Sequence, residues 1–266
     1  MTDLSKFTTK DELFSFLKEN KEALIAEKKF ELKKADAFHT NAWISHKSDS
    51  QKAINATDKL GVRVVINTTN LMDSHDDVHI DGLWNKTITE KKQLYLLQEH
   101  KMSFDHIISS EINPAIMNMS WKDLGYNMEG QTQALIFDAQ IEHKRNPFMF
   151  DQYKNGYVSN HSVGMRYVKL YLAINDTRSE YATEKDVWDK YYTMIANKEV
   201  ADEKGYFWAV TEAKLVEGSA VPMGSNFATP TLEVNEPLKA LNNDTDSRNS
   251  TISNEIKSIF KQTLFN

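Results

Sequence analysis

The sequence predicts an α+β protein, in which a mainly antiparallel β domain carries a few helices. Three observations support this class. The 266 residues are 40% hydrophobic and 26% charged, which is typical of a globular chain with a sizeable core. Short runs rich in β-branched and aromatic residues recur from Gly61 onward. Helical spacing of apolar residues is confined to a few segments before, between and after those runs.

The composition also narrows the possible chemistry and partners. The chain has no cysteine, which excludes disulfides, thiolate metal ligands and a cysteine nucleophile. Its net charge of −6 argues against a nucleic-acid partner, because such a protein would carry a basic face. We expect no membrane partner, since no apolar run is long enough to span a bilayer. The polar N-terminus does not resemble a secretory signal.

Residues 1–60 contain no glycine or proline, and we expect them to form a helical N-terminal extension. Thr9 and Glu12 have the spacing of a capping box. Apolar residues follow at near-helical intervals, with lysines and glutamates between them. This pattern predicts one amphipathic helix from about Lys10 to Lys34.

A β domain is expected over residues 61–235. A short helix should begin at Pro147 and end near Tyr153, because Gly156 follows it. A second helix should start at Thr183, whose hydroxyl can cap it. The predicted strands are 61–67, 93–98, 116–121, 134–141, 157–174 and 207–216.

Residues 236–266 are expected to form a flexible linker and a short C-terminal helix. The segment 242–250 is polar throughout and has little to bury. Apolar residues from Ile252 to Leu264 then recur at helical spacing. This helix could be a docking element or a removable tail, or it could pack back on the domain.

The densest polar cluster lies between Asp73 and Asp81. His75, Asp77, His79 and Asp81 are residue types that bind zinc or manganese, so a metal-dependent hydrolase is one hypothesis. The spacing matches neither an HExxH pair, nor an EF-hand loop, nor a phosphate-binding loop. We therefore favour an exposed loop, and predict no metal and no cofactor.

Three further segments carry residues suited to acid–base and nucleophilic chemistry. His100 ends an apolar strand, where a rigid backbone can hold a general base. Ser162 is followed by Gly164, which permits close backbone approach, and by Arg166. Glu217 near the end of a strand can orient a histidine. Taken singly, each of these residues is better explained by a structural role.

In order along the chain, these segments resemble the prohead maturation proteases of HK97-type tailed phages, over about Gly61 to Val234. The sequence departs from the family at Lys101, where aspartate is common, at Met165, where phenylalanine is common, and at Gly218, where valine is common. The matching segments are the acidic loop 73–78, the strand 96–100 (LLQEH), the segment 162–166 (SVGMR) and the segment 217–222 (EGSAVP).

The resemblance implies a herpesvirus-assemblin-like fold, a closed β-barrel with surrounding helices, and serine endopeptidase activity. It assigns His100 as the general base and Ser162 as the nucleophile. Glu217 is the first choice for the third catalytic residue. His161 and His143 are alternatives, since related enzymes use a second histidine. The Gly164 backbone and Arg166 are candidates for the oxyanion site.

The resemblance also implies the partners. The substrates would be the scaffolding segment of the major capsid protein and the protease itself, as a homo-oligomer inside the assembling prohead in the host cytoplasm. The linker 242–250 is a plausible self-cleavage region. A non-catalytic internal scaffold on the same fold is the alternative, and Lys101 and Gly218 favour it.

Overall fold

The computed structural model describes residues 4, 6–31, 58–90 and 92–235. The described residues belong to one compact unit, Met1–Glu236, and a second unit comprises Pro237–Asn266. The predicted linker 242–250 and the predicted C-terminal helix lie outside the described residues. The same holds for residues 32–57 of the predicted N-terminal extension.

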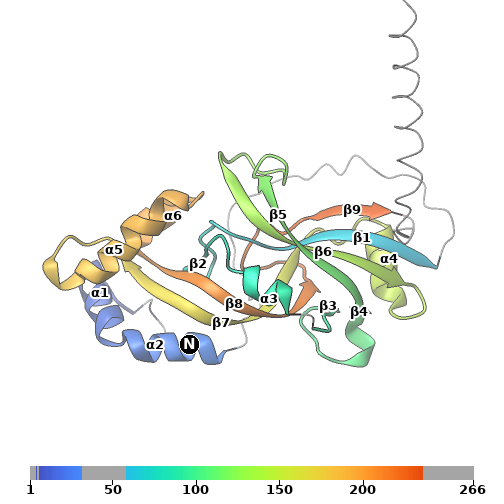
Figure 1. Cartoon of the computed structure of the whole chain (residues 1–266), viewed down its shortest axis with the longest axis horizontal. Coiled ribbons are helices and arrows are strands. Elements are labelled where there is room, and N and C mark those ends of the chain that lie inside the picture. The colour runs from blue at the N-terminus through green and yellow to red at the C-terminus, as the bar shows by residue number, and fades with distance from the viewer. Residues whose placement is uncertain (1–3, 5, 32–57, 91, 236–266) are drawn as a thin grey trace, which may run out of the picture. The chain divides into compact units, whose positions relative to one another are not determined.

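The described elements are strands with short helices before and between them (Figure 1). In chain order they are α1 (Lys10–Glu19), α2 (Lys21–Phe30), β1 (Lys59–Thr68), β2 (Asp77–His79), α3 (Asn85–Thr89), β3 (Leu96–Gln98), η1 (Phe104–His106), β4 (Ile107–Ser109), β5 (Glu111–Ser120), β6 (Gln131–Glu142), α4 (Pro147–Lys154), β7 (His161–Ile174), η2 (Ser179–Tyr181), α5 (Ala182–Tyr191), η3 (Tyr192–Met194), α6 (Lys198–Lys204), β8 (Tyr206–Ala220) and β9 (Thr231–Asn235).

The strands form two sheets. One has four antiparallel strands in the order β5-β6-β1-β9. The other has five strands and is mixed, with β8 at its centre. Strand β7 runs antiparallel along the whole length of β8, while β2 and β3 run parallel to its two ends on the other side. Buried side chains from both sheets share one large core.

The predicted closed β-barrel is wrong. The chain is α+β with mixed sheets, and among the described strands neither sheet closes on itself. Closure needs a continuous ladder of hydrogen bonds around the barrel. Here β2, β3 and β4 have only three residues each, and they extend the sheet only beside part of β8.

The N-terminal segment forms two helices instead of the predicted single one. Thr9 caps α1, because its hydroxyl accepts a hydrogen bond from the Glu12 amide at 3.2 Å. At Asn20 the backbone leaves the helical conformation, and the side-chain amide donates to the Phe16 carbonyl at 2.9 Å. Asparagine favours such local side-chain bonds at helix ends. Leu17 of α1 is fully buried in the main core.

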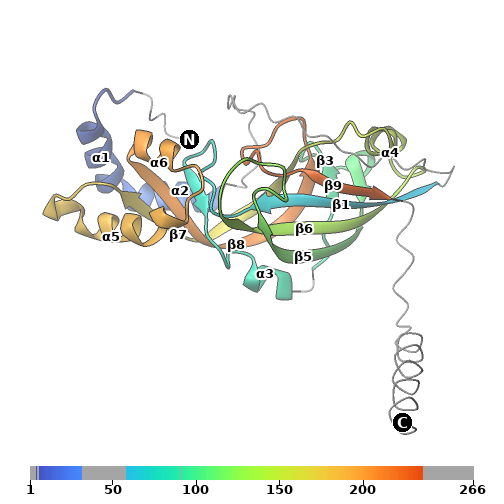
Figure 2. The ribbon, with the colours of Figure 1, turned by 90° about the horizontal axis from the view of Figure 1, so that it is seen from above.

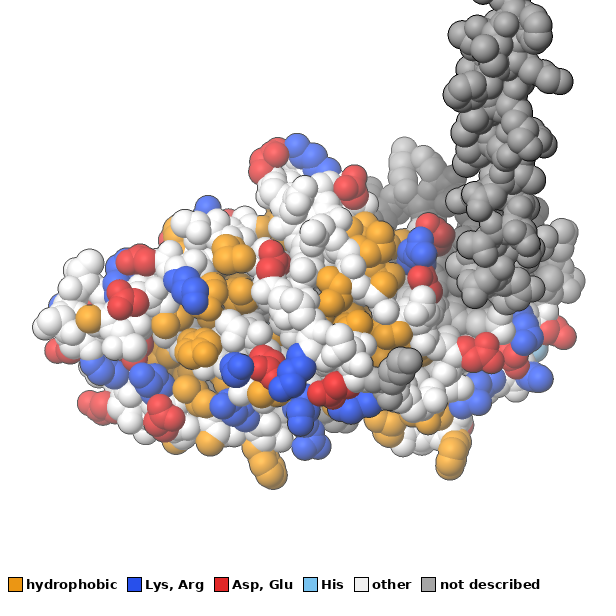
Figure 3. Space-filling model, viewed as in Figure 1, with side chains coloured by type: hydrophobic (Ala, Val, Ile, Leu, Met, Phe, Trp, Pro, Cys, Tyr) orange, Lys and Arg blue, Asp and Glu red, His pale blue; other side chains and the backbone are white. Residues whose placement is uncertain are grey.

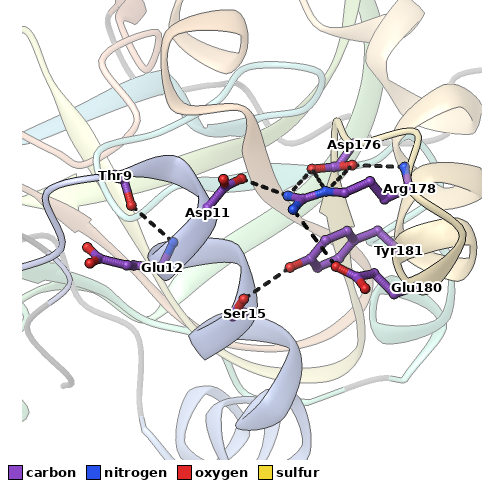
Figure 4. Close-up of polar contacts among 8 residues, drawn as sticks. All are labelled: Thr9, Asp11, Glu12, Ser15, Asp176, Arg178, Glu180 and Tyr181. Carbon is purple, nitrogen blue, oxygen red and sulfur yellow. Dashed lines mark hydrogen bonds and ion pairs between the residues drawn. The ribbon is translucent and has the colours of Figure 1, made fainter.

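A polar network connects α1 to the segment before α5 (Figure 4). The Arg178 guanidinium forms ion pairs with Asp11 of α1 at 2.7 Å and with Asp176 at 2.6 Å. The hydroxyls of Ser15 and Tyr181 are 3.3 Å apart. Exposed ion pairs of this kind contribute about 1 kcal/mol or less each, so burial of the apolar face contributes most to the docking of α1.

All the labelled helices except α3 lie toward one or the other end of the long β7–β8 pair (Figures 1 and 2). Helices α1, α2, α5 and α6 gather at the end where Ile174 pairs with Tyr206, and α4 lies toward the other end. Helix α5 begins at Ala182, so the predicted cap at Thr183 is wrong and this residue lies in the first turn. The shortest elements, such as β2 and α6, were not predicted from the sequence.

None of the helices in the described parts of the chain is long and apolar enough to cross a membrane. On the face shown in Figure 3, acidic and basic side chains of the described residues are interspersed. No continuous basic area is visible among the described residues on that face.

Candidate active site

His100 is held in a tight turn immediately after β3. The backbone of Glu99 and of His100 has φ of +52° and +57°, the left-handed region that costs about 1–2 kcal/mol per non-glycine residue. Hydrogen bonds to β8 hold this turn. The Glu99 amide donates to the Ala220 carbonyl at 3.0 Å, and the His100 amide donates to the Ser219 hydroxyl at 3.1 Å.

The turn brings the His100 ring against Glu217. Nδ1 of His100 lies 2.6 Å from Oε1 of Glu217, and both side chains are almost completely buried. An ionised Glu217 carboxylate would accept a hydrogen bond from a protonated Nδ1, an arrangement that leaves Nε2 as the basic nitrogen. The second oxygen of Glu217 accepts a bond from the Ser219 hydroxyl at 2.6 Å.

Ser162 lies on the neighbouring strand, on the same face as this pair. In the antiparallel register of β7 and β8, Ser162 is opposite Ser219, and Gly164 is opposite Glu217. Residues two apart on a strand share a face, and directly opposite Cβ atoms are about 5 Å apart. The predicted base, nucleophile and acid therefore lie in one neighbourhood. The described hydrogen bonds include none between His100 and Ser162, and catalytic bonds often tighten only when substrate binds.

Gly164 provides space for the carboxylate. A Cβ atom at this position would lie 2.0 Å from Oε1 of Glu217, which is impossible without movement. Only glycine therefore allows Glu217 to lie directly over β7. Arg166, the other predicted support residue, is exposed and pairs with Lys214 beyond a register shift between Gly164 and Met165. The described contacts of Arg166 include none with His100 or Glu217.

The segment after β8 covers Ser162. Ser162 is only 6% exposed. Gly224 lies against it, since a Cβ at Gly224 would be 3.7 Å from Cβ of Ser162 and 2.8 Å from the His161 carbonyl oxygen. A small cavity of about 10 Å³, bordered by Ser162 and Asn226, remains beneath the segment. It is just large enough for one water molecule.

His161 and His143, the alternatives for the third catalytic residue, make other contacts. His161 is fully buried, and burial lowers its pKa to about 4. Its ring is 2.9 Å from the Tyr153 hydroxyl and 3.1 Å from the Thr229 carbonyl, a structural arrangement. His143 follows β6 in the other sheet, where its ring packs edge-on against Phe150 with centroids 5.2 Å apart.

The cluster 73–81 is not an exposed loop, so that interpretation is wrong. Asp77 is fully buried, forms a 2.5 Å ion pair with Lys28 of α2 and accepts a 2.7 Å bond from the Tyr167 hydroxyl. Burial alone would raise the pKa of Asp77, but Lys28 and Tyr167 hold it below its usual value. Burial raises the pKa of the neighbouring Asp73 to about 6.

His79 belongs to the same buried network. Its Nδ1 is 2.9 Å from the Asn67 amide nitrogen and its Nε2 is 3.3 Å from the Tyr167 hydroxyl, while burial lowers its pKa to about 4. Asp81 accepts bonds from Thr69 and Asn70. Within the described ranges, no group of three or more histidine, aspartate or glutamate residues is arranged to hold a metal ion.

Two features of the site were not foreseen from the sequence. Ser219 contacts both His100 and Glu217, and the spacing of Glu217 and Ser219 was the available signal, because it places both on one face of a strand. Lys101, a departure from the family pattern, forms a 2.7 Å ion pair with exposed Glu99.

No protein-family model, curated protein or solved structure matched the chain.

Proposed function

We propose that the protein is a serine endopeptidase in which Ser162 is the nucleophile, His100 the general base and Glu217 the acid that orients it. The observation that supports this proposal best is the 2.6 Å contact between His100 and Glu217, on the sheet face that carries Ser162. A buried histidine–carboxylate pair beside a serine is the arrangement that activates a hydroxyl.

In the proposed reaction, Nε2 of His100 takes the Ser162 proton as Oγ bonds to the carbonyl carbon of a peptide. Glu217 stabilises the imidazolium that forms. The imidazolium then gives its proton to the leaving amine as the C–N bond breaks. His100 then takes a proton from water as the water oxygen bonds to the acyl carbon, and returns that proton to Ser162 Oγ as the acyl C–O bond breaks. We assign the oxyanion contact to the Gly164 backbone, where a register shift interrupts the ladder.

The proposed substrates follow from the resemblance to prohead proteases. They are the scaffolding segment of a major capsid protein and the chain's own polar segment 242–250. Both would present an extended backbone to the site, as proteolysis requires.

Mass spectrometry of the chain co-expressed with its capsid protein tests this proposal. Wild-type protein should remove the scaffolding segment, and Ser162→Ala should leave it intact. Ser159→Ala is the matched control, because Ser159 is an exposed serine just before the same strand and should retain processing. Processing that continues unchanged in Ser162→Ala would contradict the assignment of the nucleophile.

One observation favours a second candidate, a non-catalytic internal scaffold. Ser162 is nearly covered, and the cavity beside it has room for about one water molecule but not for a peptide. A scaffold would need no access to Ser162. Intact capsid protein inside assembled shells, with both wild type and Ser162→Ala, would support the scaffold over the protease.

A further inference from the structure

We propose that Ser219 is a positioning residue for the catalytic pair, a role that rests on the proposed function of His100 and Glu217. Its hydroxyl makes two hydrogen bonds with different partners. It accepts from the backbone amide of His100 at 3.1 Å and donates to Oε2 of Glu217 at 2.6 Å. One side chain therefore connects the base and the acid, which are 117 residues apart in the sequence.

The first bond fixes the turn that presents the base. Glu99 and His100 both occupy the left-handed region, so the turn is strained and needs external support. Ser219 and the Ala220 carbonyl of β8 supply that support through the two backbone amides. Loss of the Ser219 hydroxyl would leave the His100 amide with no partner from this side chain and would allow the ring to shift.

The second bond fixes the acid. Glu217 has one oxygen on His100 and the other on Ser219, so its carboxylate cannot rotate without breaking a bond. Ser219 is completely buried, so water does not replace its hydroxyl easily. A hydrogen bond to a charged group contributes more than a neutral one, which makes this contact sensitive to substitution.

The same residue also lies between the pair and the nucleophile. Ser219 is directly opposite Ser162 in the register of β7 and β8, and opposite Leu97 in the register of β8 and β3. The Ser219 hydroxyl is already bonded to the His100 amide and to Glu217, which argues against Ser219 as the nucleophile itself. A position central to three strands is suited to holding the base and acid at a fixed distance from Ser162.

An alkyl fluorophosphonate measures the reactivity of Ser162 without a known substrate. The Ser162 oxygen bonds to phosphorus, fluoride leaves, and His100 takes the hydroxyl proton. We expect Ser219→Ala to label about 10- to 100-fold more slowly than wild type, as for loss of a hydrogen bond to a charged group. Ser219→Cys keeps a side chain of similar size but is a weaker donor, so its rate should lie between the two.

Ser109→Ala is the matched control. Ser109 is a buried serine that accepts from the Glu111 amide and donates to the Gln140 carbonyl, away from the pair. It should lose comparable stability in thermal unfolding but label at the wild-type rate. Equal rates for folded Ser219→Ala and wild type, or equal slowing in Ser109→Ala, would overturn the positioning role. If Ser219→Ala does not fold, Ser219→Cys decides, and a wild-type rate there would overturn it.

Proton NMR separates this inference from the proposed function. The Nδ1–H proton of His100, assigned by its loss in His100→Ala, should move or disappear in Ser219→Ala and persist in Ser109→Ala. An unchanged signal in Ser219→Ala contradicts placement of the ring by Ser219, whatever the reactivity. Absence of Ser162 labelling in the wild type contradicts the proposed function instead.

Discussion

Gly164 of β7 and Gly218 of β8 leave room for neighbouring side chains on the two faces of the five-stranded sheet. A side chain at Gly164 would occupy the space of the Glu217 carboxylate, on the face of the candidate site. A side chain at Gly218 would lie 2.7 Å from Phe137 and 2.8 Å from Ile66, on the face of the core. Gly218 therefore has a packing reason in this chain, and its presence does not by itself argue against catalysis.

These two positions should respond differently to alanine. Gly164→Ala should displace Glu217 from His100 and slow fluorophosphonate labelling of Ser162 about 100-fold or more. Gly218→Ala should overpack the core and lower the free energy of unfolding by about 1–3 kcal/mol, while labelling persists. Labelling rates and urea unfolding of both variants check this. A wild-type labelling rate in Gly164→Ala would contradict the prediction that Ser162 needs Glu217 beside His100.

His161 should make stability depend on pH. Its pKa is lowered to about 4 by burial, so the unfolded chain, with a pKa near 6.5, binds the proton more readily. Stability from this residue is present above pH 6.5 and is lost as the pH falls toward 4. Between these values, wild type should lose about 3 kcal/mol more than His161→Gln in urea unfolding. Parallel pH profiles for the two proteins would contradict this assignment.

At the scale of elements, α2 is connected to the β domain through a buried charge. Lys28 of α2 pairs with Asp77 of β2, which is fully buried. Sequence periodicity predicted an amphipathic helix here, and Leu24 does face the core. It did not predict that a lysine on that helix also points inward. A lysine is normally exposed, so its burial becomes visible only when the partner carboxylate is located in space.

Lys28→Ala should therefore destabilise the protein strongly. It leaves Asp77 buried without its cation, which costs about 3–5 kcal/mol in comparable cases. Lys29→Ala, at the exposed neighbouring position, should change stability by about 0.5 kcal/mol or less. Adding Asp77→Asn to Lys28→Ala should recover part of the loss. Equal urea midpoints for Lys28→Ala and Lys29→Ala would contradict the buried ion pair.

The length of β8 shows how an element boundary affects the site. The sequence predicted a strand over 207–216, whereas β8 continues to Ala220. The extra residues include Glu217 and Ser219, and strand geometry places both on the face toward Ser162. The sequence placed Glu217 only near the end of a strand, which did not determine the direction of its side chain.

For the whole molecule, the α+β class and most long strands could be predicted, but the arrangement of the sheets could not. Runs typical of strands predicted 134–141 and 157–174, which lie close to β6 and β7. The parallel pairing of β2 and β3 with β8 depends on three-residue segments and on contacts more than 100 residues apart. That pairing makes the second sheet mixed and replaces the barrel implied by the family resemblance.

The candidate site was predicted in part. The family resemblance put forward His100, Ser162 and Glu217 as one site, and the His100 and Glu217 side chains are in contact. The covering of Ser162 by the segment around Gly224 could not be predicted, because this segment lies between two strands and has no periodic pattern. In the proposed reaction, this segment would have to move before a peptide could reach Ser162.

The reaction of Ser162 with an alkyl fluorophosphonate tests the central claim most directly. Peptide mapping by mass spectrometry should find one adduct, on Ser162, in the wild-type protein. His100→Ala should slow its formation about 100-fold or more, because the general base is removed. No adduct at Ser162, or an adduct that forms equally fast without His100, would contradict a catalytic partnership between these two residues.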